Sequence, residues 1–138
     1  MKKFLILLLF VLVQNWIDEK DGIPCYDVND MDSIGFDAKD LRVRAGEEFY
    51  IKLPPLPKTI YSYKLKNYDS IPDELEVYGD NGEPYITEGG NLGYGRLNSP
   101  ITQYFKFKAL ASSYNKITLR FINRNTDSDI KVKLTIKN

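Results

Sequence analysis

The chain has 138 residues, which corresponds to one domain, and hydrophobic residues make up 43% of it, enough to build a packed core. Lysine plus arginine balance aspartate plus glutamate at 19 each, so no basic excess indicates binding to nucleic acid or to an anionic membrane surface. Histidine is absent, which excludes a Ser-His-Asp or Cys-His catalytic centre and a histidine-ligated zinc site.

The N-terminus has the pattern of a signal peptide. Two lysines precede an apolar run from Phe4 to Val13, which is too short to span a bilayer as a helix. No small-residue cleavage site follows this run, so the cleavage point stays open, and a buried N-terminal strand or helix is the alternative. We predict a signal peptide over residues 1–17 and a mature domain over residues 18–138. The protein is then expected in the secretory pathway, either in a lysosome or vesicle lumen or outside the cell.

The segment between the leader and the first regular strand pattern is polar and acidic. Cys25 is the only cysteine of the chain, so an internal disulfide is impossible, and the sequence leaves open whether this thiol links two chains. Turn-forming residues run from Gly22 to Asp40. We expect one short strand in this segment, near Ser33–Phe36.

From Leu41 onward, apolar and polar residues alternate with a period of two in segment after segment, which is typical of strands with one face in a core. The residues predicted to face inward are Leu41, Val43, Ala45, Phe49, Ile51, Leu53, Tyr61, Tyr63, Leu65, Phe105, Phe107, Ala109, Ile117, Leu119, Phe121, Ile130, Val132, Leu134 and Ile136. About seven or eight such strands predict an all-β, immunoglobulin-like antiparallel β-sandwich, although the pattern alone does not separate a sandwich from a small barrel.

A proline-rich connection, LPPLPKTIY over Leu53–Tyr61, lies between two of these strands. Proline lowers the entropy of an unbound loop, so less ordering is needed when the loop docks on a partner. The prolines alternatively do no more than end a strand. Recognition of Pro54–Pro57 by SH3 or WW domains is disfavoured, because those domains are cytoplasmic and the leader indicates another compartment.

Two further connections stand out. The glycine-rich stretch Gly89–Arg96 lacks the Lys-Ser/Thr pair of a phosphate-binding loop, so no nucleotide site is expected. The stretch Ile122–Ile130 consists mostly of hairpin-turn formers, and Arg124 is its one residue that offers a forked donor to a partner. Because alternate connections of a sandwich emerge at the same end, the three loops are expected to form one binding surface.

At this point the chain resembles the chagasin family of inhibitors of papain-like cysteine peptidases, from about Leu41 to Asn138. The family's Asn-Pro-Thr-Thr-Gly loop falls, with matches at the proline and the second threonine, on Leu56, Pro57, Lys58, Thr59 and Ile60, with the aromatic Tyr61 following. Its Gly-x-Gly-Gly loop falls, with matches at the first two glycines, on Gly93, Tyr94, Gly95 and Arg96. Its Arg-Pro-Trp/Phe loop falls, in a shortened connection, on Asn123, Arg124 and Asn125.

The resemblance implies a reversible, non-covalent inhibitor whose three loops enter the active-site cleft of a papain-like, cathepsin-type peptidase. The expected protein is a monomer that is not an enzyme, needs no cofactor or metal, binds no nucleic acid and has no stable membrane span. Thr59 and its neighbours would cover the catalytic cysteine, the glycines would let the backbone lie close to the peptidase, and Arg124 would take a peripheral polar role. The alternative is a secreted adhesion or ligand-binding module with the same fold.

Overall fold

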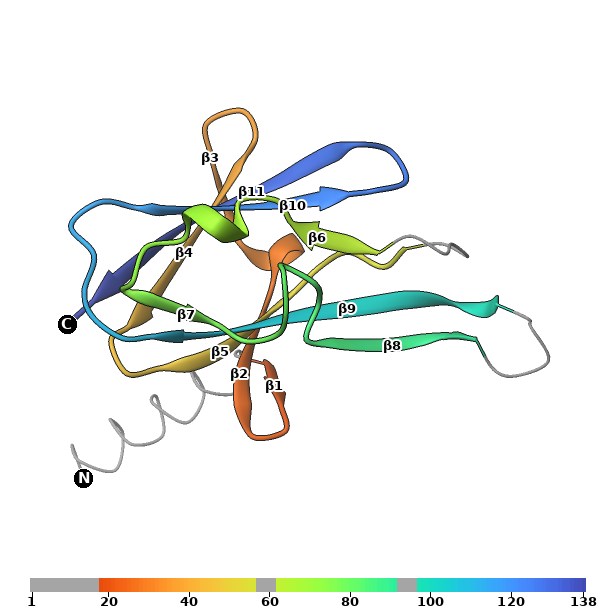
Figure 1. Ribbon diagram of the computed structural model, residues 1–138, viewed down its shortest axis with the longest axis horizontal. Helices are drawn as coiled ribbons and strands as arrows, with labels where there is room; N and C mark the ends of the chain where they lie inside the picture. Colours follow the sequence, from red (N-terminus) through yellow and green to blue (C-terminus); the bar gives the residue numbers. More distant parts are fainter. Residues whose placement is uncertain (1–17, 57–61, 92–96) are drawn as a thin grey trace, which may run out of the picture.

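The computed structural model describes residues 18–56, 62–91 and 97–138, and the signal peptide predicted over residues 1–17 therefore stays a prediction. The described chain forms two β-sheets that pack face to face (Figure 1). Its elements are β1 (Asp18–Lys20), β2 (Ile23–Asp27), β3 (Asp32–Ile34), β4 (Ala38–Arg44), β5 (Glu48–Lys52), β6 (Tyr63–Leu65), β7 (Leu75–Val77), β8 (Ile86–Asn91), β9 (Leu97–Ala109), β10 (Ile117–Asn123) and β11 (Ser128–Lys137), with two short 3-10 helices, η1 (Val28–Asp30) and η2 (Tyr68–Ser70). The arrangement is a β-sandwich, as predicted.

Both sheets are mixed rather than purely antiparallel. One sheet has the strand order β1-β2-β5-β9-β7, with β8 also paired to β9, and the other has the order β3-β4-β11-β10-β6. The pairs β2–β5 and β4–β11 are parallel, and all other pairs among the described strands are antiparallel. An alternation of apolar and polar residues is the same for either strand direction, so the sequence pattern gave no signal for these two pairs.

The core lies between the sheets and is built from the residues that the alternation places inward. The predicted residues that the structure describes are buried, except Ala45 and Ile130, which are partly buried and pack against the core. Phe105 and Phe121 join the two sheets at the centre, with ring centroids 4.8 Å apart. Aromatic pairs at this separation contribute beyond the area that they bury, so these rings fix how the two sheets face each other.

The N-terminal segment contains more regular structure than its polar sequence indicated. Strand β2 extends one sheet, and the short strand expected near Ser33–Phe36 is β3, which ends at Ile34. Phe36 lies in the turn after it, fully exposed. Gly35, with φ +68°, makes this tight turn possible, because glycine adopts positive φ without steric cost.

Cys25 lies on β2 and is only 6% exposed. Burial raises the pKa of its thiol, so the protonated and unreactive form is favoured at neutral pH. A buried, protonated thiol is poorly placed to form a disulfide with a second chain.

Gly82, in the connection between β7 and β8, provides a test of the packing. Its φ is +77°, and a Cβ added to it would lie 2.6 Å from the carbonyl oxygen of Leu65, whose N–H donates to the Gly82 carbonyl at 2.8 Å. Gly82→Ala should therefore lower the free energy of unfolding in two ways. Backbone strain should cost about 1–2 kcal/mol, and the clash with the Leu65 carbonyl should cost about 1–3 kcal/mol.

Gly46 is the matched control, because its φ is +92° but nothing lies within 4 Å of an added Cβ. Gly46→Ala should cost only the strain, so Gly82→Ala should reduce the free energy of unfolding by clearly more in urea denaturation. Equal losses for the two variants would contradict the close packing at Gly82.

Candidate functional site

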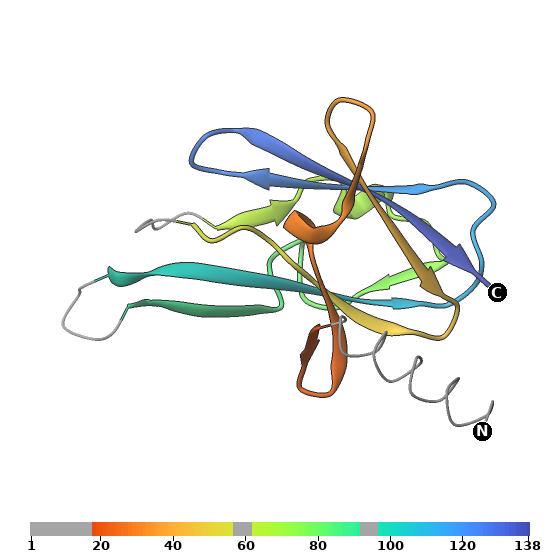
Figure 2. The ribbon, with the colours of Figure 1, turned by 180° about the vertical axis from the view of Figure 1, so that it is seen from behind.

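Three connections emerge at one end of the sandwich, as the sequence predicted. They join β5 to β6, β8 to β9 and β10 to β11, and their strand ends lie together at the right of Figure 1 and at the left of Figure 2, where the molecule is seen from behind. Nine predicted site residues in the first two connections lie outside the described residues: Pro57, Lys58, Thr59, Ile60, Tyr61, Gly93, Tyr94, Gly95 and Arg96. The described residues therefore define the base on which these loops stand.

The first connection is tied to strand β9, which leads out of the second. Leu56 and Ile101 exchange two backbone N–H···O hydrogen bonds, each 2.8 Å long, and the N–H of Leu53 donates to the carbonyl of Gln103 at 3.1 Å. The side chain of Leu56 is 1% exposed and belongs to the core. Leu56, predicted as a contact residue, is thus an anchor that holds the proline-rich loop to the sheet.

A buried glutamine closes the other side of the first connection. Gln103, on β9, is 3% exposed, and its Oε1 accepts the backbone N–H of Tyr63 at 2.8 Å while its Nε2 donates to Thr87 Oγ1 at 3.1 Å. The hydroxyl of Tyr63 donates in turn to the carbonyl of Pro54 at 3.0 Å. Burial raises the pKa of this hydroxyl, so it stays a donor, and both ends of the proline-rich loop are fixed.

Arg124 connects the third loop to the first. Its Nε donates to the backbone carbonyl of Ser62 at 3.0 Å, and its Nη2 bonds the Ser62 hydroxyl and forms an ion pair with Glu83 Oε2 at 3.2 Å. Ser62 directly follows the first loop, and its own hydroxyl reaches Glu83 at 3.4 Å. The guanidinium predicted to face a partner is therefore already engaged within the protein, where it holds the end of the proline-rich connection.

The third connection is a short turn. The carbonyl of Asn123 accepts the N–H groups of Thr126 and Asp127, and its side-chain Oδ1 accepts the N–H of Asn125 at 2.9 Å. Asp127 has a positive φ of 59°, a conformation that aspartate tolerates in turns. Asn123 and Asn125 thus shape the turn of this hairpin.

Strands β8 and β9, which lead into and out of the second connection, contact the N-terminal strand β1. Lys20, on β1, pairs with Glu88 on β8, and its Nζ lies 4.4 Å from the ring centroid of Tyr104 on β9. A shift in register between Gly89 and Asn91 marks an irregularity in β8 just before the glycine-rich loop. The N-terminal hairpin β1–β2 therefore steadies the hairpin that carries the second connection.

Sequence reasoning missed Gln103, Ser62 and Glu83. The sequence did indicate that Gln103 is buried, because in the alternation of β9 it falls on the same inward-facing side as Phe105 and Phe107. A polar side chain at an inward position needs buried partners, which predicts a structural hydrogen bond. Ser62 and Glu83 are far apart in the chain and carried no such signal.

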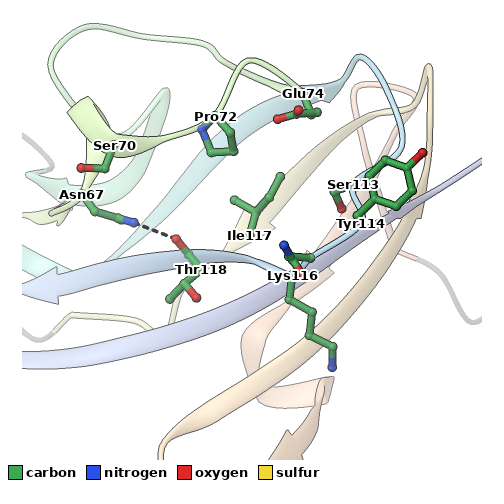
Figure 3. A pocket seen from close by; sticks show the side chains of 10 residues that line it. Asn67, Ser70, Pro72, Glu74, Ser113, Tyr114, Lys116, Ile117 and Thr118 are labelled. Atoms are coloured by element: carbon green, nitrogen blue, oxygen red, sulfur yellow. Dashed lines mark hydrogen bonds between the residues drawn. The ribbon is translucent and has the colours of Figure 1, made fainter.

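A further hollow of the described residues lies away from the three connections. A hollow of about 480 Å³, lined partly by η2 and by residues 113–118, holds one carboxylate, Glu74 (Figure 3). Its polar groups serve the fold, since Asn67 Nδ2 donates to the Thr118 carbonyl at 2.7 Å and Lys116 pairs with Asp40. Across residues 18–56, 62–91 and 97–138, no cluster of three potential ligands suits a metal ion, and no helix has the length and apolar character to cross a membrane.

Replacing Gln103 with methionine should leave the Tyr63 N–H buried without an acceptor, which costs about 1–3 kcal/mol of stability. Thr87→Val is the control, because Thr87 is exposed and its substitution removes only the acceptor of Nε2, while the Tyr63 N–H keeps its acceptor. The free energy of unfolding, measured in urea, should fall clearly more for Gln103→Met. A loss no larger than that of the control would show that Gln103 does not hold the loop base.

A family match identifies the group of proteins to which this chain belongs. The family described as chagasin family peptidase inhibitor I42 matches residues 42–137. A solved structure, the solution structure of Amebosin, is similar at 16% sequence identity with a TM-score of 0.48, over 82% of this chain and 96% of that one. No curated protein matches the chain significantly. The family match covers more than half of the chain and includes strands of both sheets of the immunoglobulin-like sandwich, and the chain therefore belongs to the chagasin family, whose members inhibit cysteine peptidases.

Proposed function

We propose that this protein is a reversible, non-covalent inhibitor of papain-like, cathepsin-type cysteine peptidases, and that it acts as a monomer through the three loops at one end of the sandwich. Family membership supports inhibition of cysteine peptidases in general and a protein without catalytic activity of its own. The observation that carries the finer proposal is the hydrogen-bonded base: Leu56 with Ile101 and Arg124 with Ser62 join all three connections.

A rigid base matters because binding costs entropy whenever loops must be ordered. Here the proline-rich loop leaves the sheet between two fixed points, the Leu56–Ile101 bridge and the Tyr63–Gln103 contact. Fixed ends of this kind lower the entropy that a connecting loop loses when it binds a partner. Interfaces of standard size, about 1,600 Å², reach about nanomolar affinity when they are preorganised, which corresponds to about −12 kcal/mol.

We assign a role to each residue according to the connection in which it lies. Thr59 and its neighbours would occlude the catalytic cysteine, and Gly93 and Gly95 would allow close approach of the backbone. Arg124 would act indirectly, since its guanidinium holds Ser62 and Glu83. The short third turn lacks the aromatic anchor of the family pattern, and such anchors are commonly worth about 2 kcal/mol or more, so we expect weaker inhibition than by a member with all three motifs.

Titration against papain and against a cathepsin-type enzyme tests the proposal. Residual peptidase activity should fall with added protein and should return after dilution, because the inhibition is non-covalent. A peptidase that stays fully active at about micromolar protein would instead support an adhesion or ligand-binding module with the same fold.

Thr59→Arg tests the assignment of the proline-rich loop. A long charged side chain should prevent the loop from fitting the cleft and weaken inhibition at least about tenfold, with an unchanged melting temperature. Ser33→Arg is the matched control, since Ser33 is exposed on β3, outside the three connections. Equal inhibition constants for both variants would show that the loop does not make the contact.

A further inference from the structure

A second surface of interest lies beside strand β7, away from the three connections. A hollow of about 470 Å³ opens along this strand, and the apolar residues Ile71, Leu75, Val77 and Leu110 line it. Leu75 is 4% exposed, whereas Leu110 is 51% exposed. The hollow thus has an apolar floor and an accessible apolar wall.

Strand β7 is an edge of its sheet. It pairs with β9 at the end of the strand order, and among the described strands it has no second neighbour (Figure 1). The N–H of Leu110 donates to the carbonyl of Glu74, and the N–H of Tyr78 donates to the carbonyl of Lys106. Because hydrogen-bonded residues alternate along an antiparallel strand, the peptide groups of Val77 face the open edge, next to the hollow.

The rim of the hollow is strongly acidic. Asp69, Asp73 and Glu76 line it, and no described residue forms an ion pair or a side-chain hydrogen bond with Asp69 or Asp73. The sequence from residue 67 to residue 95 contains no lysine or arginine, although the whole chain has a net charge of +0. Lys108, on β9, lies directly opposite Glu76 and balances part of this charge, and the carboxylates of Asp69 and Asp73 are left for an outside partner to neutralise.

We propose that this groove docks an extended, basic segment of a partner protein that also carries an apolar side chain. The segment would place the apolar side chain against Leu75 and Leu110, align its backbone with the edge of β7, and bring its lysines or arginines to Asp73 and Glu76. This is strand addition, in which the sheet edge gives affinity and the flanking hollow and charges give selectivity.

Strand β7 and the strand ends that carry the three connections lie toward opposite ends of the long axis of the molecule (Figure 1, Figure 2). A partner at β7 would therefore leave the loops accessible, so the protein would be able to hold a peptidase and this partner at the same time. This docking proposal is independent of the proposed peptidase inhibition, because none of the residues that line the groove belongs to the three connections.

A short fluorescein-labelled peptide in which lysine and leucine alternate is a suitable probe, with fluorescence anisotropy as the readout. The test variant combines Asp73→Lys, Glu76→Lys and Leu110→Ser, all at solvent-accessible positions. The control variant makes the same changes on another surface, Asp30→Lys, Asp32→Lys and Phe36→Ser, and so carries the same net charge. Circular dichroism melting checks that both variants are folded.

The wild type and the control should bind the probe similarly, and the test variant should bind at least about tenfold more weakly. Binding should weaken with added salt, which screens the exposed charges, and a peptide with serine in place of leucine should bind more weakly because it leaves the hollow unfilled. Similar binding by the two variants, or equal binding of the serine peptide, would overturn the proposal. Self-association of the wild type that the test variant abolishes, measured by light scattering, would overturn it too, since the occupant would then be a second copy.

Discussion

The hydrogen bond from the backbone of Tyr63 to the side chain of Gln103 is the contact on which the loop-bearing end of the molecule depends. A donor buried between two sheets has no access to water, so an unsatisfied N–H at this point would cost a large share of the stability of a small domain. Gln103 satisfies it from the opposite sheet, because Tyr63 begins β6 in one sheet and Gln103 lies on β9 in the other. The same contact therefore fixes the distance between the sheets where the proline-rich connection crosses from one to the other.

Arg124, which the family resemblance places in a peripheral polar role toward a peptidase, also has partners within the protein. The resemblance placed this side chain toward a peptidase, but its guanidinium contacts Ser62 and Glu83. Arginine suits this position because its planar fork bonds a carbonyl, a hydroxyl and a carboxylate together. Arg124 thus joins the third connection to the end of the first through a single side chain.

The sequence was most informative where one face of a strand is buried. Alternation predicted the inward residues of β5, β9, β10 and β11, because a one-residue slip would expose the whole apolar face. It did not predict β2, because this short strand lies in a polar segment without a clear alternation. It also did not predict the parallel pairing of β4 with β11, because the alternation of apolar and polar residues is the same for parallel and antiparallel strands. The base of the site was also missed, because Ser62, Glu83 and Arg124 meet only after the strands have paired, and no local pattern anticipates such contacts.

The position of β11 has a consequence for how the chain reaches its native state. Strand β11 lies between β4 and β10, parallel to β4, so this five-stranded sheet lacks its central strand until β11 is available. Contacts between distant parts of a chain form slowly, because a long loop must close before they give any stabilisation. The sandwich therefore closes only once β11 is present, and a chain that lacks β11 exposes the apolar inner faces of β4 and β10.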